Sequence, residues 1–406
     1  MKPMGAIPAE FRGDGDGLLI GGTSAKKLAE GGTPLFAYDR RMIADRIRRF
    51  RSAFCVISLH YAIKANGYTP LLSFIAKSVD GLDVASAGEM ELALAAGARA
   101  EEVSFAGPGK RDEELAAAIG AGVTVNLESE GEAERALAIA RSQGRRPRLA
   151  VRVNPDFEIR GSGMRMGGGA KPFGVDAERV PALVRRLLDA GADWRGFHVF
   201  AGSQALDSSA VIEAQAATLD LAAKLAAAAG ESPKLVNLGG GFGIPYFHGQ
   251  GPLDIEAVGP ALAAALDARP AILRDTGFAI ELGRWLVGQA GVYLTRVVDR
   301  KVSHGKTFLV VDGGMHHQLA ASGNFGQKIR RNYPVAVASR FGAEPEEEVS
   351  VVGCLCTPLD RLADDVMLPR ADVGDVIAVF QAGAYGLSAS PQAFLGHPPA
   401  REILVG

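Results

Sequence analysis

The strongest constraint on the fold is an alternation between short apolar runs and longer amphipathic segments, from about residue 55 to residue 284. Eight runs rich in branched residues have the length of strands, and the segments between them have helical periodicity. A strand followed each time by a crossover helix predicts an α/β fold, namely a (β/α)8 TIM barrel, with a doubly wound parallel sheet as the alternative. The expected strands are 56–63, 81–84, 103–105, 123–126, 149–153, 196–200, 235–238 and 278–281. The expected helices are 69–78, 87–96, 112–119, 128–142, 180–190, 211–229 and 255–266.

After residue 285 the pattern changes to alternating runs that end in turns, at 288–300, 306–311, 348–352 and 376–379. Alternation with a period of two is typical of strands that are buried on one face. We therefore expect a barrel over residues 36–284 and a C-terminal β-rich domain, a β-barrel or sandwich, over residues 285–406. Residues 1–35 have no partner in the barrel, so we expect them to join the β-rich domain.

The composition is that of a globular protein with balanced charge. Apolar residues make up 48% and charged residues 22% of the 406 residues, and the net charge is −2. With this charge balance we expect neither a nucleic-acid partner nor binding to a membrane surface. No apolar stretch is long enough to span a bilayer. No secretory signal is expected, and three cysteines are too few for a disulfide framework. We therefore expect a cytoplasmic protein.

Functional side chains in such a barrel gather at the carboxyl ends of the strands. Lys64 ends the first apolar run, and its apolar flanks favour the uncharged amine that a Schiff base requires, although a lone lysine there could snorkel at the surface. The glycines at 239–241 would let backbone N–H groups approach a phosphate, but such runs are also common turns. Glu281 ends the last run and would either pair with a cofactor's ring nitrogen or form a salt bridge.

These spacings together resemble those of the fold-type III pyridoxal 5′-phosphate (PLP) decarboxylases, typified by the diaminopimelate and ornithine decarboxylases. The resemblance covers nearly the whole chain, and the ordered set of motifs is more specific than any one of them. The motifs are Tyr61-Ala62-Ile63-Lys64-Ala65-Asn66, Leu82-Asp83-Val84-Ala85-Ser86, Arg152-Val153-Asn154-Pro155, Gly202-Ser203-Gln204, the run 239–241, Glu281-Leu282-Gly283-Arg284, the segment 356–360 and Gly383-Ala384-Tyr385.

The resemblance implies a role for each of these residues. Lys64 would carry PLP covalently, Glu281 would pair with the ring nitrogen, and Asp83 and Arg152 would support the lysine and the ring. The phosphate would be held by Ser203, Gly240, Gly241, Gly283, Arg284 and Tyr385. The resemblance also implies a homodimer with shared active sites, in which Cys356 and Asp360 reach into the neighbouring site. Cys356 would protonate Cα after CO₂ leaves, although it could instead be a small buried apolar residue.

The sequence departs from the family pattern at two positions. The family usually has a second histidine, stacked on the cofactor ring, where this chain has Phe200 in His198-Val199-Phe200-Ala201-Gly202-Ser203. A phenyl ring can stack equally well but cannot exchange protons. Diaminopimelate decarboxylases also have a glutamate that binds the distal amino group, where this chain has Thr357 in Cys356-Thr357-Pro358-Leu359-Asp360. Diaminopimelate is therefore doubtful as the substrate.

The segment 312–326, together with 356–360, is similar to a subgroup found with exosortase A polysaccharide systems. That subgroup is similar in turn to a butirosin-pathway enzyme that decarboxylates glutamate tethered to a carrier protein. The resemblance implies either a small-molecule or a carrier-tethered substrate, with contacts from Arg284, Arg330, Arg331, Tyr333, Thr357, Asp360 and Tyr385. His316 and His317 could form a metal pair, but a solvated loop or a pocket lining is favoured, and no metal site is expected.

Three other functions fit the same motifs less well. Diaminopimelate decarboxylase is the nearest alternative. An alanine racemase would need a second base, usually a tyrosine, facing the lysine across the ring, and Cys356 fits decarboxylation better. A PLP-binding protein without activity would often be a lone barrel, whereas this chain has a second domain, Lys64 and Cys356. We therefore expect a PLP-dependent amino acid decarboxylase.

Overall fold

The computed structural model describes residues 2–161, 163–165, 167–327 and 329–406. The chain forms two compact units. One unit contains residues 47–243 and 252–283, and the other contains residues 1–46, 244–251 and 284–406. The unit that contains the C-terminus therefore also includes residues 36–46 and 244–251, which the sequence pattern places with the barrel.

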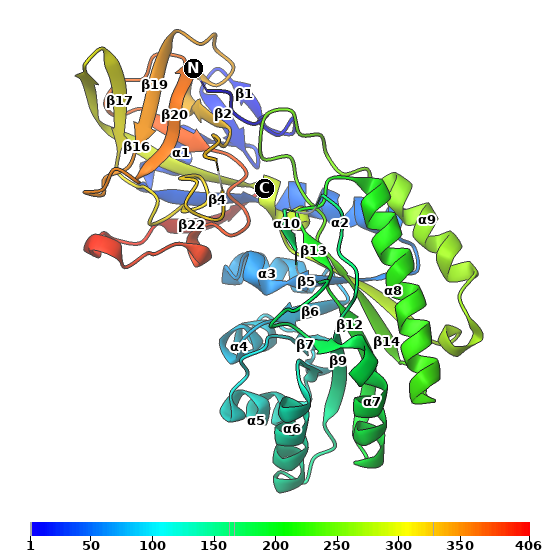
Figure 1. The fold of residues 1–406 in the computed structure, drawn as a ribbon. Helices are drawn as coiled ribbons and strands as arrows, with labels where there is room; N and C mark the ends of the chain where they lie inside the picture. The colour runs from blue at the N-terminus through cyan, green and yellow to red at the C-terminus, as the bar shows by residue number, and fades with distance from the viewer. Residues whose placement is uncertain (1, 162, 166, 328) are drawn as a thin grey trace. The chain divides into compact units, whose positions relative to one another are not determined.

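The first unit is a closed barrel of parallel strands with helices around it (Figure 1). Among the described residues, eight strands form the barrel in the order β9-β12-β14-β15-β5-β6-β7-β8, and pairing of β8 with β9 closes it. This arrangement confirms the predicted (β/α)8 barrel and excludes the doubly wound sheet. The strands are β5 (Ser58–Ala62), β6 (Gly81–Val84), β7 (Val103–Phe105), β8 (Thr124–Leu127), β9 (Arg148–Asn154), β12 (Asp193–Val199), β14 (Leu235–Gly240) and β15 (Gly277–Leu282).

The helices between these strands begin and end at the signals expected of helix termini. Ser86 and Ser129 each accept a hydrogen bond from the backbone N–H three residues later, which satisfies a donor that the first turn leaves free. Gly122 and Gly230 end two helices in the left-handed conformation that glycine adopts without strain. The helices are α3 (Thr69–Ala76), α4 (Ala87–Ala95), α5 (Asp112–Ala121), α6 (Glu130–Ser142), α7 (Val180–Asp189), α8 (Ser208–Ala229) and α9 (Ile255–Asp267).

Three short strands lie beside the barrel strands. β11 (Val175–Asp176) pairs in parallel with the end of β9, and β10 (Met164–Arg165) pairs with β13 (Gly202–Ser203). The β10–β13 pair places Ser203 in a regular hydrogen-bonded segment immediately after β12, so its backbone position is fixed.

The second unit is built on a mixed β-sheet. The long strand β16 (Gly291–Ser303) pairs with three others, β17 (Lys306–Val311), β21 (Val376–Val379) and β4 (Leu35–Asp39). The sheet also contains β18 (Val335–Val337), β19 (Glu347–Val352), β20 (Arg361–Leu368) and β22 (Arg401–Val405). A smaller sheet contains β1 (Arg12–Asp14), β2 (Gly17–Ile20) and β3 (Thr23–Ser24), and the helices of this part are α1 (Ala25–Glu30), α10 (Arg284–Val287) and the first half of α2 (Arg40–Ala53).

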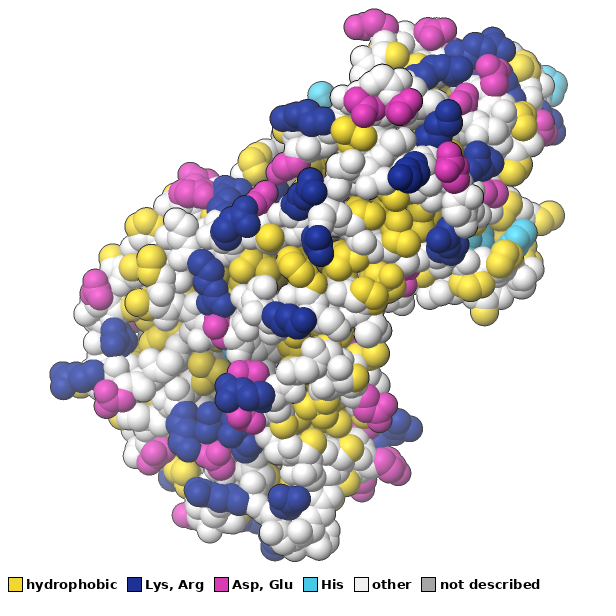
Figure 2. All heavy atoms as spheres, turned by 180° about the vertical axis from the view of Figure 1, so that it is seen from behind, with side chains coloured by type: hydrophobic (Ala, Val, Ile, Leu, Met, Phe, Trp, Pro, Cys, Tyr) yellow, Lys and Arg dark blue, Asp and Glu magenta, His cyan; other side chains and the backbone are white. Residues whose placement is uncertain are grey.

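The surface carries both signs of charge. Figure 2 shows Lys and Arg side chains interspersed with Asp and Glu over the face that it presents, with apolar side chains between them. Across the part of the chain that the structure describes, no helix is both long and apolar enough to cross a membrane.

Candidate active site

The carboxyl ends of the barrel strands bring together those predicted site residues that belong to the barrel unit. Parallel strands of a closed barrel all end at one face, so residues distant in sequence become neighbours there. Those from the barrel unit are Lys64, Asp83, Arg152, Phe200, Ser203, Gly240, Gly241, Glu281 and Gly283. Arg284, Tyr385 and the segments 330–333 and 356–360 belong to the β-rich unit.

Lys64 lies in a single 3-10 turn, Ile63–Ala65, that follows β5. The side chains on either side of it are buried, whereas Lys64 itself is exposed. Its Nζ atom lies 5.5 Å from the centre of the Phe200 ring. The amine is therefore available to react, and the phenyl ring that replaces the family's histidine faces it.

Glu281 is a buried carboxylate at the end of β15. It contacts His198 Nε2 at 2.9 Å and accepts a hydrogen bond from Asn237 Nδ2 at 3.2 Å. Burial alone would raise the pKa of Glu281, but His198, Lys64 and Arg152 lower that pKa to about 2. The group is therefore an anion at any working pH, as a partner for a protonated ring nitrogen must be.

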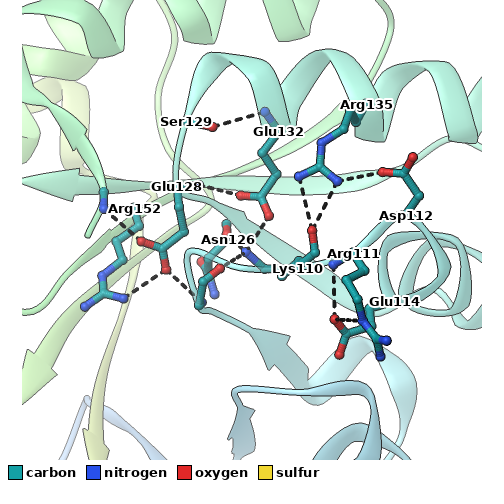
Figure 3. Close-up of polar contacts among 12 residues, drawn as sticks. Lys110, Arg111, Asp112, Glu114, Asn126, Glu128, Ser129, Glu132, Arg135 and Arg152 are labelled. Carbon is teal, nitrogen blue, oxygen red and sulfur yellow. Dashed lines mark hydrogen bonds and ion pairs between the residues drawn. The ribbon is translucent and has the colours of Figure 1, made fainter. Parts of the chain in front are cut away.

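Arg152 forms an ion pair with Glu128, a residue that sequence reasoning missed (Figure 3). Arg152 Nη1 lies 2.9 Å from Glu128 Oε1, and the same carboxylate accepts hydrogen bonds from Gly107 N at 2.7 Å and Gly174 N at 2.8 Å. These contacts lower the pKa of Glu128 despite its burial. Glu128 thus fixes the guanidinium and two loops at once.

His198 was also missed as a site residue. It is buried beside Glu281, and its Nδ1 atom has no hydrogen-bond partner among the described residues. Its position near the carboxyl end of β12, two residues before Phe200, is the signal that could have identified it.

The glycines after β14 are required by close approach of backbones. A Cβ atom on Gly240 would lie 1.8 Å from Glu281 O, and one on Gly241 would lie 2.0 Å from Gly202 O. Gly239 and Gly241 also have φ values of +68° and +75°, which other residues rarely adopt. The glycine run therefore packs directly on β15 and on the segment of Ser203.

Arg284 is the most unusual charge of the β-rich unit. Its Nη1 donates to Tyr246 Oη at 2.9 Å, and its guanidinium carbon lies 4.6 Å from the centre of the Tyr385 ring. Its Nε atom is buried, with no hydrogen-bond partner among the described residues. Burial opposes the charge, but the tyrosines raise the pKa of Arg284. A half-buried cation with a free N–H donor suits an anionic ligand group.

The backbone beside Arg284 is equally constrained. Tyr385 has a φ of +51°, and a Cβ atom on Gly383 would lie 1.8 Å from Val287 O. This strained turn fixes the Tyr385 ring against the guanidinium, and strain of this kind is often found where a ligand binds.

The three predicted substrate contacts of segment 330–333 have different environments. Tyr333 is buried against Tyr246, with ring centres 4.9 Å apart. Arg331 is exposed and its guanidinium carbon lies 3.8 Å from the centre of the Phe247 ring. Arg330 donates to Arg361 O at 2.6 Å, and burial lowers its pKa.

The segment 356–360 forms a turn between β19 and β20. Cys356 is an exposed free thiol, as a proton donor must be, and not the small buried residue of the alternative interpretation. Asp360 is buried, and its carboxylate accepts hydrogen bonds from Met315 N at 2.6 Å and Leu355 N at 2.9 Å. Burial raises the pKa of Asp360. Its visible role is therefore to hold the turn that carries Cys356 and Thr357.

His316 and His317 are buried, so the interpretation of a solvated loop is wrong. Their exposed fractions are 0% and 1%. His317 contacts Tyr293 Oη at 3.1 Å and Pro398 O at 3.0 Å, whereas neither ring nitrogen of His316 has a hydrogen-bond partner among the described residues. Among the described residues, no group of three or more His, Cys, Asp or Glu side chains could hold a metal ion.

Each unit, taken by itself, has residues that fit PLP. In the barrel unit, Lys64 offers an exposed amine and Glu281 a carboxylate whose pKa is lowered to about 2. In the β-rich unit, Arg284 offers a cation whose Nε–H has no hydrogen-bond acceptor among the described residues. These are the features of enzymes that hold PLP on a lysine at the mouth of a parallel barrel.

Comparisons with known proteins identify the family. The family described as pyridoxal-dependent decarboxylase, pyridoxal binding domain, matches residues 40–288. The chain is 38% identical over 379 residues to the L-glutamyl-[BtrI acyl-carrier protein] decarboxylase of Niallia circulans, covering 92% of this chain and 88% of that protein. This chain belongs to the family of PLP-dependent decarboxylases.

Diaminopimelate decarboxylases are also similar to the chain. That of Archaeoglobus fulgidus is 35% identical over 399 residues, covering 96% of this chain and 92% of that protein. The structure of the M. jannaschii diaminopimelate decarboxylase in complex with L-lysine has a TM-score of 0.89 and 26% identity, covering 98% of this chain and 93% of that one. The fold and the cofactor class are thus shared across the relatives.

Proposed function

We propose that this decarboxylase acts on an amino acid tethered to a carrier protein. The observation that carries the proposal is Thr357, which stands where diaminopimelate decarboxylases have the glutamate that binds the distal amino group. The similarity to a decarboxylase of an acyl-carrier-protein-bound glutamyl group supports it.

Asp360, the acid within the turn 356–360, is not free to replace that glutamate. Thr357 Oγ1 accepts a hydrogen bond from Leu359 N at 3.3 Å, and the nearby Asp360 carboxylate is occupied by two backbone N–H groups. A distal ammonium group would lose a charged hydrogen bond worth about 1.5–3 kcal/mol. A substrate whose distal end is neutral, as in an acyl chain that continues toward a carrier, loses nothing at this position.

The residues of the barrel then have the following proposed roles. Bound PLP supplies an electron sink for the negative charge left at Cα when CO₂ departs. Lys64 holds the cofactor covalently, Glu281 keeps its ring nitrogen protonated, and Phe200 covers one face of the ring. Asp83 and Arg152 orient Lys64 and the ring. The phosphate group is held by Ser203, Gly240, Gly241, Gly283, Arg284 and Tyr385.

The residues of the β-rich unit would bind the substrate and return a proton. Arg330, Arg331, Tyr333, Thr357 and Asp360 surround the substrate in this proposal, directly or by fixing the turn. Cys356 gives the proton of its thiol to Cα. Its exposure in the structure supports this role.

We also propose a homodimer in which Cys356 serves the site of the partner subunit. Mixed dimers of Lys64→Ala and Cys356→Ala subunits should then contain one intact site each. Random reassociation should restore about a quarter of the wild-type sites. Activity that does not recover after verified subunit exchange would contradict shared sites. The cytoplasmic location stays a prediction from the free cysteines.

Diaminopimelate decarboxylase is the second candidate function, because several relatives have that activity in their names. The two functions are separated by one set of assays. CO₂ release should be measured with a glutamyl-loaded carrier protein, with free L-glutamate, and with meso-diaminopimelate, lysine and ornithine.

We expect the tethered amino acid to be the best substrate and the free diamino acids to react poorly. The missing charged hydrogen bond predicts a loss of about 10- to 150-fold in kcat/KM for the diamino acids. A kcat/KM for diaminopimelate of about 10⁴ M⁻¹s⁻¹ or more, within the ordinary enzyme range, would overturn the proposal and favour diaminopimelate decarboxylase. The Thr357→Glu variant is the matched test, since it should improve diaminopimelate turnover.

A further inference from the structure

A polar cavity of about 200 Å³ lies inside the barrel near the amino ends of its strands. Its lining begins at the first residues of several strands, such as Ser58 and Thr124, and extends one layer inward to His60 and Asn237. Lys64 and Glu281 lie toward the carboxyl ends of the same strands. The cavity and the candidate active site therefore occupy opposite ends of the barrel interior.

His60 connects the two ends. It lines the cavity, and its Nδ1 atom lies 3.3 Å from Asp83 Oδ2. Both residues are 8% exposed, and neither atom has a well-aligned hydrogen bond among the described residues. Asp83 is in turn in register with Ala62, two residues before Lys64. The imidazole and the carboxylate are thus a buried pair directly beneath the turn of Lys64.

The barrel has room for this ring because of Gly81. His60 and Gly81 are in register on neighbouring strands, and a Cβ atom on Gly81 would lie 2.7 Å from His60 Nε2. A side chain at residue 81 would displace the imidazole. The lack of a side chain at Gly81 therefore fixes the orientation of the His60 ring. Its Nδ1 edge faces Asp83, and its Nε2 edge faces Gly81.

Acids surround His60 from both neighbouring strands. Asp83 lies on β6, and Asp80 directly precedes that strand. On the other side, Glu281 of β15 is in register with His60. Arg148 and Glu102 also line the cavity, and Lys64 is the cation at the carboxyl end of the same strand. Burial lowers the pKa of His60, but Asp83, Glu281 and Asp80 outweigh it, so the pKa is raised.

A second residue of the cavity lining, Asn237, contacts the active-site carboxylate Glu281. Asn237 lines the cavity and donates a hydrogen bond from Nδ2 to Glu281 Oε2 at 3.2 Å. Asn237 cannot titrate, whereas His60 can, so His60 is the contact between the cavity and this layer that we expect to exchange a proton.

We propose that His60 is a positioning residue of the active site that exchanges a proton with water in the cavity at the amino end of the barrel and so sets the charge beneath Lys64. With His60 protonated, the His60–Asp83 pair has no net charge. When one ring proton passes to water in the cavity, the pair carries one negative charge. That charge stabilises positive charge on the nearby lysine and cofactor.

The inference rests on the cofactor class and not on the proposed substrate, so it can be tested without turnover. The first experiment is a histidine NMR titration of the full-length, PLP-loaded enzyme with labelled histidine. The His60 resonance, assigned by its loss in His60→Gln, should titrate, and Asp83→Asn should lower its midpoint by about one pH unit or more. A midpoint that Asp83→Asn leaves unchanged would overturn the proposal.

The second experiment follows the visible absorption of bound PLP with pH. His60→Gln keeps a polar side chain but removes the titrating group, leaving the negative charge of Asp83 in place at all pH values. The midpoint of the spectral transition should rise by about one pH unit, as expected for a unit charge roughly 10 Å away at an effective dielectric constant of about 20. Ser58→Ala, in the same strand and the same cavity, should leave the midpoint unchanged.

Two outcomes would count against His60 in this experiment. An unchanged midpoint in His60→Gln contradicts the proposal, and so does an equal shift in His60→Gln and Ser58→Ala, because it would show a general effect of the cavity. If His60→Gln does not fold, His60→Asn takes its place, both for assigning the His60 resonance and for the absorption titration.

Discussion

Glu281 shows how one residue acquires its function from its surroundings. A carboxylate buried to this extent would normally be neutral, but His198, Asn237 and the positive charges of Lys64 and Arg152 keep it ionised. Because the negative charge is already in place and fixed, no reorganisation is needed when positive charge is held on the cofactor ring.

The Glu281→Gln variant should therefore lose activity with little change in fold. We expect kcat to fall on the order of 10²–10³-fold, the usual effect of removing one fixed electrostatic partner. Steady-state kinetics measures the loss, and Glu91→Gln, at an exposed position of α4, serves as the control. A Glu281→Gln enzyme within a few-fold of the wild-type kcat would show that this carboxylate does not serve the cofactor.

The residues that sequence reasoning identified and those it missed differ in a physical way. Lys64 and Glu281 could be identified because a polar residue directly after an apolar strand is conspicuous. Glu128 and His198 act by holding another side chain, and their partners come from other strands. His60 directly precedes the lysine motif but had no assigned role, because its partner Asp83 becomes a neighbour only when the strands pair.

At the scale of elements, a buried ion pair joins α6 to the loop before α5 (Figure 3). Lys110 Nζ donates to Gly107 O at 2.7 Å, to Asn126 O at 2.8 Å and to Glu132 Oε1 at 2.9 Å. Burial lowers the pKa of Lys110. The other oxygen of Glu132 accepts a hydrogen bond from Glu128 N and so caps α6.

Glu132→Gln should leave the cap in place but leave Lys110 as an uncompensated buried charge. We expect the free energy of unfolding to fall by about 3–5 kcal/mol. Glu134→Gln in the same helix is the matched control, because its exposed pair with Arg186 is worth about 0–1 kcal/mol. Equal losses in denaturant unfolding of the two variants would mean that burial does not distinguish the two pairs.

The histidine cluster of the β-rich unit makes a prediction about pH. Burial, together with His317 and His397, lowers the pKa of His316 to about 4 from an ordinary value of 6.5. Between these two values the unfolded chain binds more protons than the folded chain, so stability must fall as the pH falls from about 6.5 toward 4.

The free energy of unfolding should therefore be lower at pH 5 than at pH 7, and His316→Gln should reduce the difference. His248→Gln, at an exposed histidine, should leave the difference unchanged. If His316→Gln keeps the full pH dependence, the buried imidazole is not the group that titrates.

At the scale of the molecule, the barrel was predictable and the β-rich unit only in part. A segment of helical period lies between each barrel strand and the next, so the change of period marks each boundary. β4 (Leu35–Asp39) is buried throughout and pairs with β16 and β22, which lie far along the chain. No local alternation marks such a strand, and β20 is interrupted by the acidic pair Asp364 and Asp365.

The central claim is that this family member holds its cofactor on Lys64, and it is tested most directly by chemical fixation. The purified protein should absorb visible light, and borohydride should bleach that band and attach the cofactor to a single peptide. Peptide mapping should then find the modification on Lys64, and Lys64→Ala should take up none. Modification of another lysine, with Lys64 unmodified, would contradict the site described above.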